Sequence, residues 1–137
     1  MSFQNQFTKT TTDANLMETV HHGSAEYPFR YYYENIALFD FKCIDWHWHS
    51  ELEFIYIESG NVVFDIGTVH FELNEGNGIM INSKILHRLQ SSSDAIIPNF
   101  LFQPSFIAPQ DSLIYKKYIN PVISSSLEYL VFQPDIP

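Results

Sequence analysis

Two histidines and a glutamate lie within seven residues of one another, in a segment that otherwise has the apolar character of strands. They are His47, His49 and Glu53. In an extended chain, side chains two residues apart project to the same face, so this spacing predicts that all three point to one side if the strand register persists through the turn. Imidazoles and carboxylates bind divalent metals and also hydrogen-bond small molecules. The segment therefore predicts a metal or ligand site.

A second histidine region lies farther along the chain. A glycine turn at Gly76 and Gly78 precedes a short apolar strand, a polar turn and then His87, at the start of the next apolar stretch. We expect this strand, turn and strand to bring His87 back across the fold toward the first three residues.

The elements that must position these side chains are strands. From Tyr27 onward, short apolar runs alternate with turn residues, a pattern typical of an all-β sandwich or barrel. The run from 52 to 57 is apolar on both faces, which predicts a central, covered strand. Eight strands are enough to close a small barrel. They are expected at 29–34, 37–44, 51–58, 61–66, 69–73, 78–81, 86–91 and 96–102.

The barrel is expected to span residues 27–105, between two segments of different character. Residues 1–26 are polar and without a sustained period, which predicts an arm that is flexible or folds only against something else. We interpret its His21-His22 pair as solvated. Residues 106–137 predict a short helix that ends at Asn120-Pro121, followed by a closing segment at 127–132. The helix should face the sheet with Leu113, Ile114 and Tyr118.

Composition limits the partners of the chain. Its 137 residues favour a single domain, and sixteen acidic against seven scattered basic residues give a formal net charge of −9. Binding to phosphates needs clustered Lys and Arg, so the chain as given is not expected to bind nucleic acid by itself. No apolar run approaches eighteen residues and no secretory signal is evident, which predicts a cytoplasmic protein with no membrane partner.

The two histidine regions resemble the two motifs of the cupin family. The pattern His47-x-His49-x3-Glu53-x6-Gly60 resembles the first motif, and Gly76 with His87 eleven positions later resembles the second. The resemblance implies a cupin-like double-stranded β-helix, or jelly-roll barrel. In metal-binding cupins the matching residues hold a divalent metal inside the barrel. The chain departs from the motifs at Phe41, Asn82, Lys84 and Ser91.

A more specific resemblance covers most of the chain from about residue 30. The strings HWHSELEFIYIESG, FELNEGNGIMINSKILHRLQSS and LIYKKYINPVISS resemble the N-terminal sensor domain of AraC-type bacterial transcription regulators. In that family a cupin-like barrel precedes a helical dimerisation element and a DNA-binding domain with two helix-turn-helix units. The resemblance implies a homodimeric regulator that reaches DNA only through a C-terminal domain missing from this chain. Residues 106–137 would lead into that missing region.

Several roles for the histidines and Glu53 stay open. The metal-binding cupins imply that His47, His49, Glu53 and His87 hold Zn²⁺, Ni²⁺, Mn²⁺ or Fe²⁺, all of which suit a nitrogen and carboxylate set. Alternatively, the same side chains hydrogen-bond an organic effector without metal, or form a purely structural network. Burying an unpaired carboxylate costs several kcal/mol, so Glu53 needs a partner in every case.

The predicted effector pocket includes further residues around these four. Phe39 and Phe41 are expected on the same inner face as the histidines, and Arg30 at the opening. An apolar pocket with a few convergent polar groups suits a sugar or a similar small metabolite.

The leading hypothesis is a non-enzymatic domain that senses a small-molecule effector. The effector would bind one arrangement of barrel and arm better than another. The alternative is a small metal-dependent cupin enzyme, an isomerase or dioxygenase, with the same four residues around its metal. A stand-alone barrel that dimerises through a sheet edge is the least specific possibility.

Overall fold

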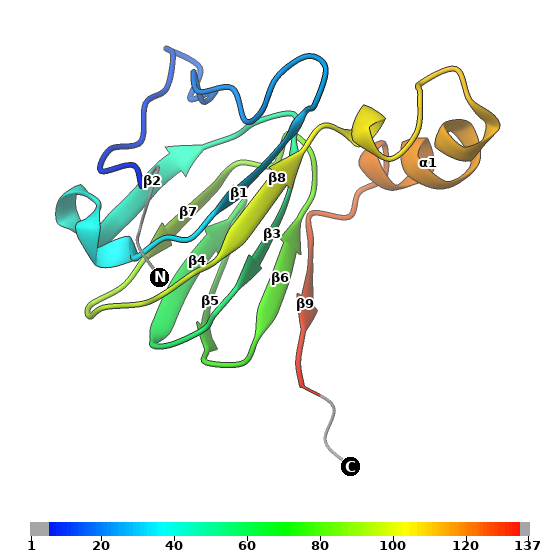
Figure 1. The fold of residues 1–137 in the computed structure, drawn as a ribbon. Helices are drawn as coiled ribbons and strands as arrows, with labels where there is room; N and C mark the ends of the chain where they lie inside the picture. The colour runs from blue at the N-terminus through cyan, green and yellow to red at the C-terminus, as the bar shows by residue number, and fades with distance from the viewer. Residues whose placement is uncertain (1–5, 135–137) are drawn as a thin grey trace.

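Two antiparallel sheets face each other around the core in the computed structural model, which describes residues 6–134 (Figure 1). One sheet has the strand order β1-β8-β3-β6-β9, and the other has the order β2-β7-β4-β5. This architecture confirms the predicted all-β, cupin-like fold. The strands are β1 (Phe29–Tyr32), β2 (Cys43–His47), β3 (Leu52–Tyr56), β4 (Asn61–Ile66), β5 (Val69–Asn74), β6 (Gly78–Ile81), β7 (His87–Gln90), β8 (Asn99–Phe102) and β9 (Tyr129–Phe132).

The core lies between the sheets and is built by the inward-facing positions of their strands. Strand β3 pairs with both β6 and β8 and is therefore central in its sheet, but on its outward face Phe54 is only half-buried and Tyr56 is exposed. Ile57, Phe64, Ile66 and Ile81 are completely buried in the main cluster. Burial of each such side chain contributes about 1.5–3 kcal/mol relative to exposure. Burial of these alternating apolar side chains thus stabilises the packing of the two sheets.

The expected strand over 37–44 is wrong over residues 37–42. Two 3-10 turns, Ile36–Leu38 and Asp40–Lys42, occupy the segment, and β2 begins only at Cys43. Phe41 adopts a φ of 61°, in the left-handed region, so strict alternation of side chains is broken there. Phe39 remains buried, but Phe41 is 98% exposed. The expectation that Phe41 shares the inner face is therefore wrong.

The segment after the barrel is helical but does not cover the sheet as expected. Its π-helical part, Tyr115–Ile119, continues into α1 (Asn120–Ile123), so Asn120-Pro121 does not end it. Pro121 falls in the first turn of α1, where a missing N–H costs little. Figure 1 shows this segment beside the sheets. The helix exposes its Leu113, Ile114 and Tyr118 side chains, while Tyr115 is buried.

Residues 6–26 fold against the barrel. The amide of Glu18 donates to the carbonyl of Trp48, and the amide of Trp48 donates to the carbonyl of Leu16. The Trp48 indole also donates to the carbonyl of Asn15 at 2.9 Å. These bonds place the arm across the end of the barrel where β2 ends. Within residues 6–134, no helix is long and apolar enough to cross a membrane.

One buried amide ties the post-barrel segment to the barrel. Asn82 is 2% exposed, and its Nδ2 donates to the carbonyls of Val122 and Leu127 at 3.0 and 2.7 Å. Its Oδ1 accepts from the amide of Ser83 at 2.8 Å. The Asn82 side chain thus joins the end of β6 to the segment after the barrel by hydrogen bonds. Asn82 is also one of the positions at which the chain departs from the second cupin motif.

We expect Asn82→Ala to lower the free energy of unfolding by about 1–3 kcal/mol, because it removes three hydrogen bonds at a buried position. Urea denaturation followed by tryptophan fluorescence measures the loss. Asn74→Ala, on the exposed edge strand β5, is the matched control and should change stability by no more than about 0.5 kcal/mol. Equal losses in the two variants would contradict the anchoring role of Asn82.

Candidate functional site

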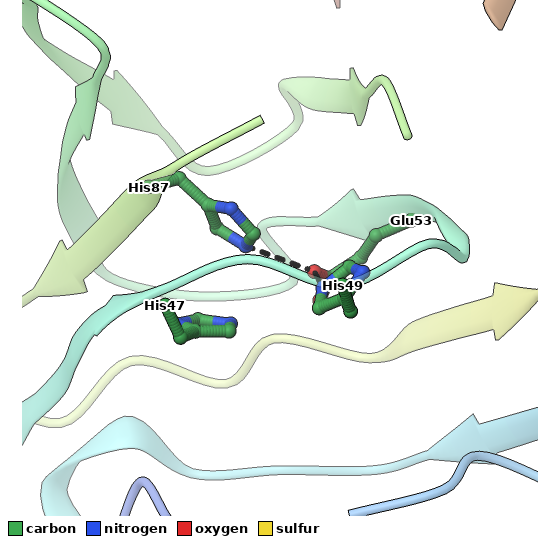
Figure 2. A group of neighbouring side chains, drawn as sticks. All are labelled: His47, His49, Glu53 and His87. Atoms are coloured by element: carbon green, nitrogen blue, oxygen red, sulfur yellow. Dashed lines mark hydrogen bonds and ion pairs between the residues drawn. The ribbon is translucent and has the colours of Figure 1, made fainter. Parts of the chain in front are cut away.

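The four ligand-type residues predicted from the sequence converge at one end of the barrel, between the two sheets. His47 ends β2 and is the cross-strand partner of His87, which begins β7. Glu53 lies in β3 of the opposite sheet, and His49 lies in the connection between β2 and β3. Figure 2 shows all four side chains pointing toward one another. Because β2 ends at His47 and Glu53 belongs to the other sheet, the four side chains meet only where the two sheets face each other.

The donor atoms of the cluster lie within 4.8 Å of one another. The Oε1 atom of Glu53 is 3.2 Å from Nε2 of His49 and 3.3 Å from Nε2 of His87. The His47 and His87 rings pack with their centroids 4.2 Å apart. All four residues are at least 92% buried. The centre is therefore compact and shielded from bulk water.

The backbone fixes the orientation of all three imidazoles in the same way. Each Nδ1 atom lies 2.7–3.0 Å from a main-chain carbonyl oxygen, which can only accept a hydrogen bond. Each Nδ1 therefore carries a proton and donates, and Nε2 is the nitrogen that faces the centre. The same arrangement orients histidine ligands in metalloproteins. The carbonyls belong to Asp45, Glu51 and Ile85.

The centre holds its charges unequally. Burial alone would lower the pKa of His49, but the hydrogen bond and negative charge of Glu53 outweigh it and raise that pKa to about 9. Burial and the neighbouring His87 and His49 lower the pKa of His47 to about 3. Burial would raise the pKa of Glu53, but hydrogen bonds from His49 and His87 hold it well below its usual range. The site thus pairs the Glu53 carboxylate with the imidazolium of His49.

Two arm residues that were not predicted, Glu18 and His22, line the cavity beside the centre. His22, interpreted as solvated, is only 6% exposed, and its Nδ1 hydrogen-bonds the Tyr32 hydroxyl at 2.6 Å. Its Nε2 bonds Glu18, and its ring packs edge-on against His49 with centroids 5.9 Å apart. No apolar period in the arm marks which residues turn inward, and the neighbouring His21 is exposed while His22 is buried. Only tertiary contact distinguishes the two.

A cavity of about 40 Å³ lies between the arm and the centre. This volume holds about three water molecules, far less than the ~300–1,000 Å³ of common ligand pockets. The cavity is lined by arm residues as well as barrel residues. They are Phe7, Lys9, Thr10, Glu18, Val20 and His22 from the arm, and Tyr32, Glu34, Phe39, Ile44, His47, His49, Glu53, Asn99 and Leu101 from the barrel.

The three remaining predicted pocket residues have different positions. Phe39 lines the cavity. Phe41 lies outside it because the 3-10 turn directs it to solvent. Arg30 is exposed on β1, with its guanidinium 5.8 Å from the centroid of the Tyr32 ring, and it does not line the cavity.

The two sheets and the enclosed polar centre define a small-molecule-binding β-barrel domain. The sequence model of the AraC-like ligand binding domain matches residues 38–108, and the chain belongs to that family. A relative is the uncharacterized HTH-type transcriptional regulator YdeC of Bacillus subtilis, 33% identical over 121 residues. The match covers 86% of this chain but 41% of the relative, so the chain spans less than half of that regulator's length.

Solved structures of similar fold include cupins at low sequence identity. A cupin-2 domain containing protein from Shewanella frigidimarina is 14% identical, with 53% of this chain and 68% of that chain covered and a TM-score of 0.47. A mutant of Bacillus subtilis oxalate decarboxylase is 16% identical, with 69% and 31% covered and a TM-score of 0.42.

The unequal charges predict distinct titrations in the chelator-treated domain. His47 should remain neutral, protonated on Nδ1, from pH 9 down to about pH 3, whereas His49 should lose a proton near pH 9. The raised pKa of His49 adds stability that is complete below its unfolded value of 6.5 and is lost as the pH rises through about 9. Two-dimensional ¹⁵N NMR of the imidazoles measures both, and titration of His47 near pH 6.5 would refute the assignment.

Proposed function

We propose that this domain senses a small-molecule effector for a DNA-binding transcription regulator and catalyses no reaction. The observation that carries the proposal is a buried centre of four convergent donors beside a cavity that the chain's own arm helps to line. Family membership supports the sensing role. The regulator would be cytoplasmic and homodimeric, and would reach DNA through a helix-turn-helix region of the kind named for its relative.

We also propose that the centre holds a divalent metal ion. The Nε2 atoms of His47, His49 and His87 and a carboxylate oxygen of Glu53 would be the ligands. The donor set fits, because backbone carbonyls already fix each Nδ1–H and direct Nε2 inward. Zn²⁺, Ni²⁺, Mn²⁺ and Fe²⁺ are all compatible with three nitrogens and one carboxylate. When bound, the ion would supply a Lewis-acidic contact for an effector oxygen or nitrogen.

Effector binding would be coupled to the position of the arm. A monosaccharide is several times larger than the cavity of about 40 Å³ beside the arm, so we infer that an effector of that size displaces part of the arm. The effector would therefore bind the open arrangement better and shift the equilibrium toward it. This coupling gives the domain two states that a regulator could read. An enzyme that admits substrate at every turnover would have to open the same closure each time.

Metal binding is tested by elemental analysis of domain purified without chelator. We expect close to one equivalent of divalent metal per chain, and a loss of most of it in His49→Gln, because the variant removes one of four ligands. His70→Gln is the matched control, since His70 is an exposed histidine outside the cluster. Equal metal contents in both variants would exclude the centre as the binding site.

Effector binding is tested separately, by the melting temperatures of the parent domain and of His49→Gln. A panel of sugars and small metabolites should include compounds that raise the melting temperature of the parent domain but not that of His49→Gln. No compound should be turned over. Catalytic turnover of a panel compound would favour the cupin enzyme instead, and stabilisation of both proteins alike would exclude binding at this centre.

The arm closure predicts a specific change in hydrogen exchange. His22→Ala removes the contacts of His22 with Tyr32 and Glu18, so the Glu18 amide, which bonds to the barrel at Trp48, should exchange about 5–30-fold faster. The exposed neighbour provides a matched control, because His21→Ala should leave the rate unchanged. Equal rates in the two variants would show that His22 does not hold the arm.

A further inference from the structure

Three carboxyl groups line the cavity, and one of them has no histidine partner. Glu53 bonds His49 and His87, and Glu18 bonds His22. Glu34 is the third, and it is 5% exposed. Within residues 6–134, no lysine, arginine or histidine forms an ion pair with it. The cavity therefore contains one buried acid that no described residue neutralises by a direct ion pair.

A neighbouring amide holds Glu34 in place. The Nδ2 atom of Asn99 donates to Oε1 of Glu34 at 2.7 Å and to the carbonyl of Ile97 at 2.9 Å, which fixes the amide. The main chain of Glu34 is fixed as well, because its carbonyl accepts from the amide of Ile97 at 2.8 Å. These bonds engage Oε1 and leave Oε2 available to a ligand in the cavity.

An uncompensated buried carboxyl group favours a partner that restores its charge. Burial raises the pKa of Glu34 to about 7, against the lowering effect of the hydrogen bond from Asn99. The negative charge of Glu53 acts in the same direction as burial. A cation beside Oε2 would offset the unfavourable free energy of the buried carboxylate, whereas a neutral group would not neutralise its charge.

We propose that Glu34 and Asn99 form a subsite for an ammonium group, so that the effector is a small amine. The inference rests on the proposed binding of an effector in this cavity. An ammonium group donates up to three hydrogen bonds and forms strong, charge-assisted contacts with a carboxylate. A hydroxyl group would leave the charge of Glu34 uncompensated. A ligand carboxylate would add another negative group beside Glu34, Glu18 and Glu53.

Three probes of equal size test the charge preference. Ethanolamine, ethylene glycol and acetate each have four non-hydrogen atoms, so the comparison tests the charge of the probe and not its size. The full 137-residue chain, purified without chelator, is titrated with each probe in amine-free phosphate buffer and followed by NMR. We expect ethanolamine to bind at least about tenfold more tightly than the other two, as a charge-assisted contact allows. It should also shift the side-chain amide signal of Asn99.

Substitution of the acid separates the subsite from the cavity. Glu34→Gln should remove the preference for ethanolamine, Glu34→Asp should retain part of it, and Glu72→Gln, on the exposed face of β5, should leave it intact. Circular dichroism checks that each variant folds. Equal binding of all probes, unchanged in Glu34→Gln, overturns the amine subsite but leaves the effector cavity standing. Binding of no probe overturns the subsite, and loss of the effector response in the metabolite panel is what overturns the proposed function.

Discussion

The carboxylate of Glu53, enclosed between two sheets, is the constraint on which the site depends. A buried carboxylate without partners would cost several kcal/mol, so the surrounding chain must supply donors at fixed positions. His49 and His87 supply them, and each is held in turn by a backbone carbonyl. Those carbonyls lie at the ends of strands. The facing of the two sheets therefore sets which donors reach Glu53, and these donors keep the pKa of its carboxyl group low.

The arm covers part of the polar centre through contacts that water can replace. The arm contacts the barrel through main-chain hydrogen bonds, and its Glu18 and His22 side chains line the cavity. Each bond contributes only about 0.5–1.5 kcal/mol net, because water replaces it when the arm opens. A closure built this way is worth a few kcal/mol. Ligand binding of ordinary affinity can overcome that amount, which is the range in which a two-state sensor responds.

The sequence predicted the centre better than its surroundings. Motif spacing identified His47, His49, Glu53 and His87, but the expected strand register does not persist through the turn, because β2 ends at His47 and Glu53 lies in the opposite sheet. Phe41 was misplaced because a left-handed turn interrupts that alternation, and no turn signal as clear as glycine marks it. His22 was missed because a polar arm has no apolar period. Its burial is decided by Tyr32 and Glu51, residues distant in sequence that approach only in the folded barrel.

A short series of hydrogen bonds connects the centre to the segment that follows the barrel. The amide of Lys84 donates to the carbonyl of His49 at 2.7 Å, and the hydroxyl of Ser83 donates to the carbonyl of Ser50 at 2.6 Å. The adjacent Asn82 bonds Val122 and Leu127 in the post-barrel segment. A shift of the His49 connection must therefore stretch these bonds or move the helical segment with it. Since packed elements switch between discrete arrangements more readily than they deform, this segment is positioned to transmit the state of the centre.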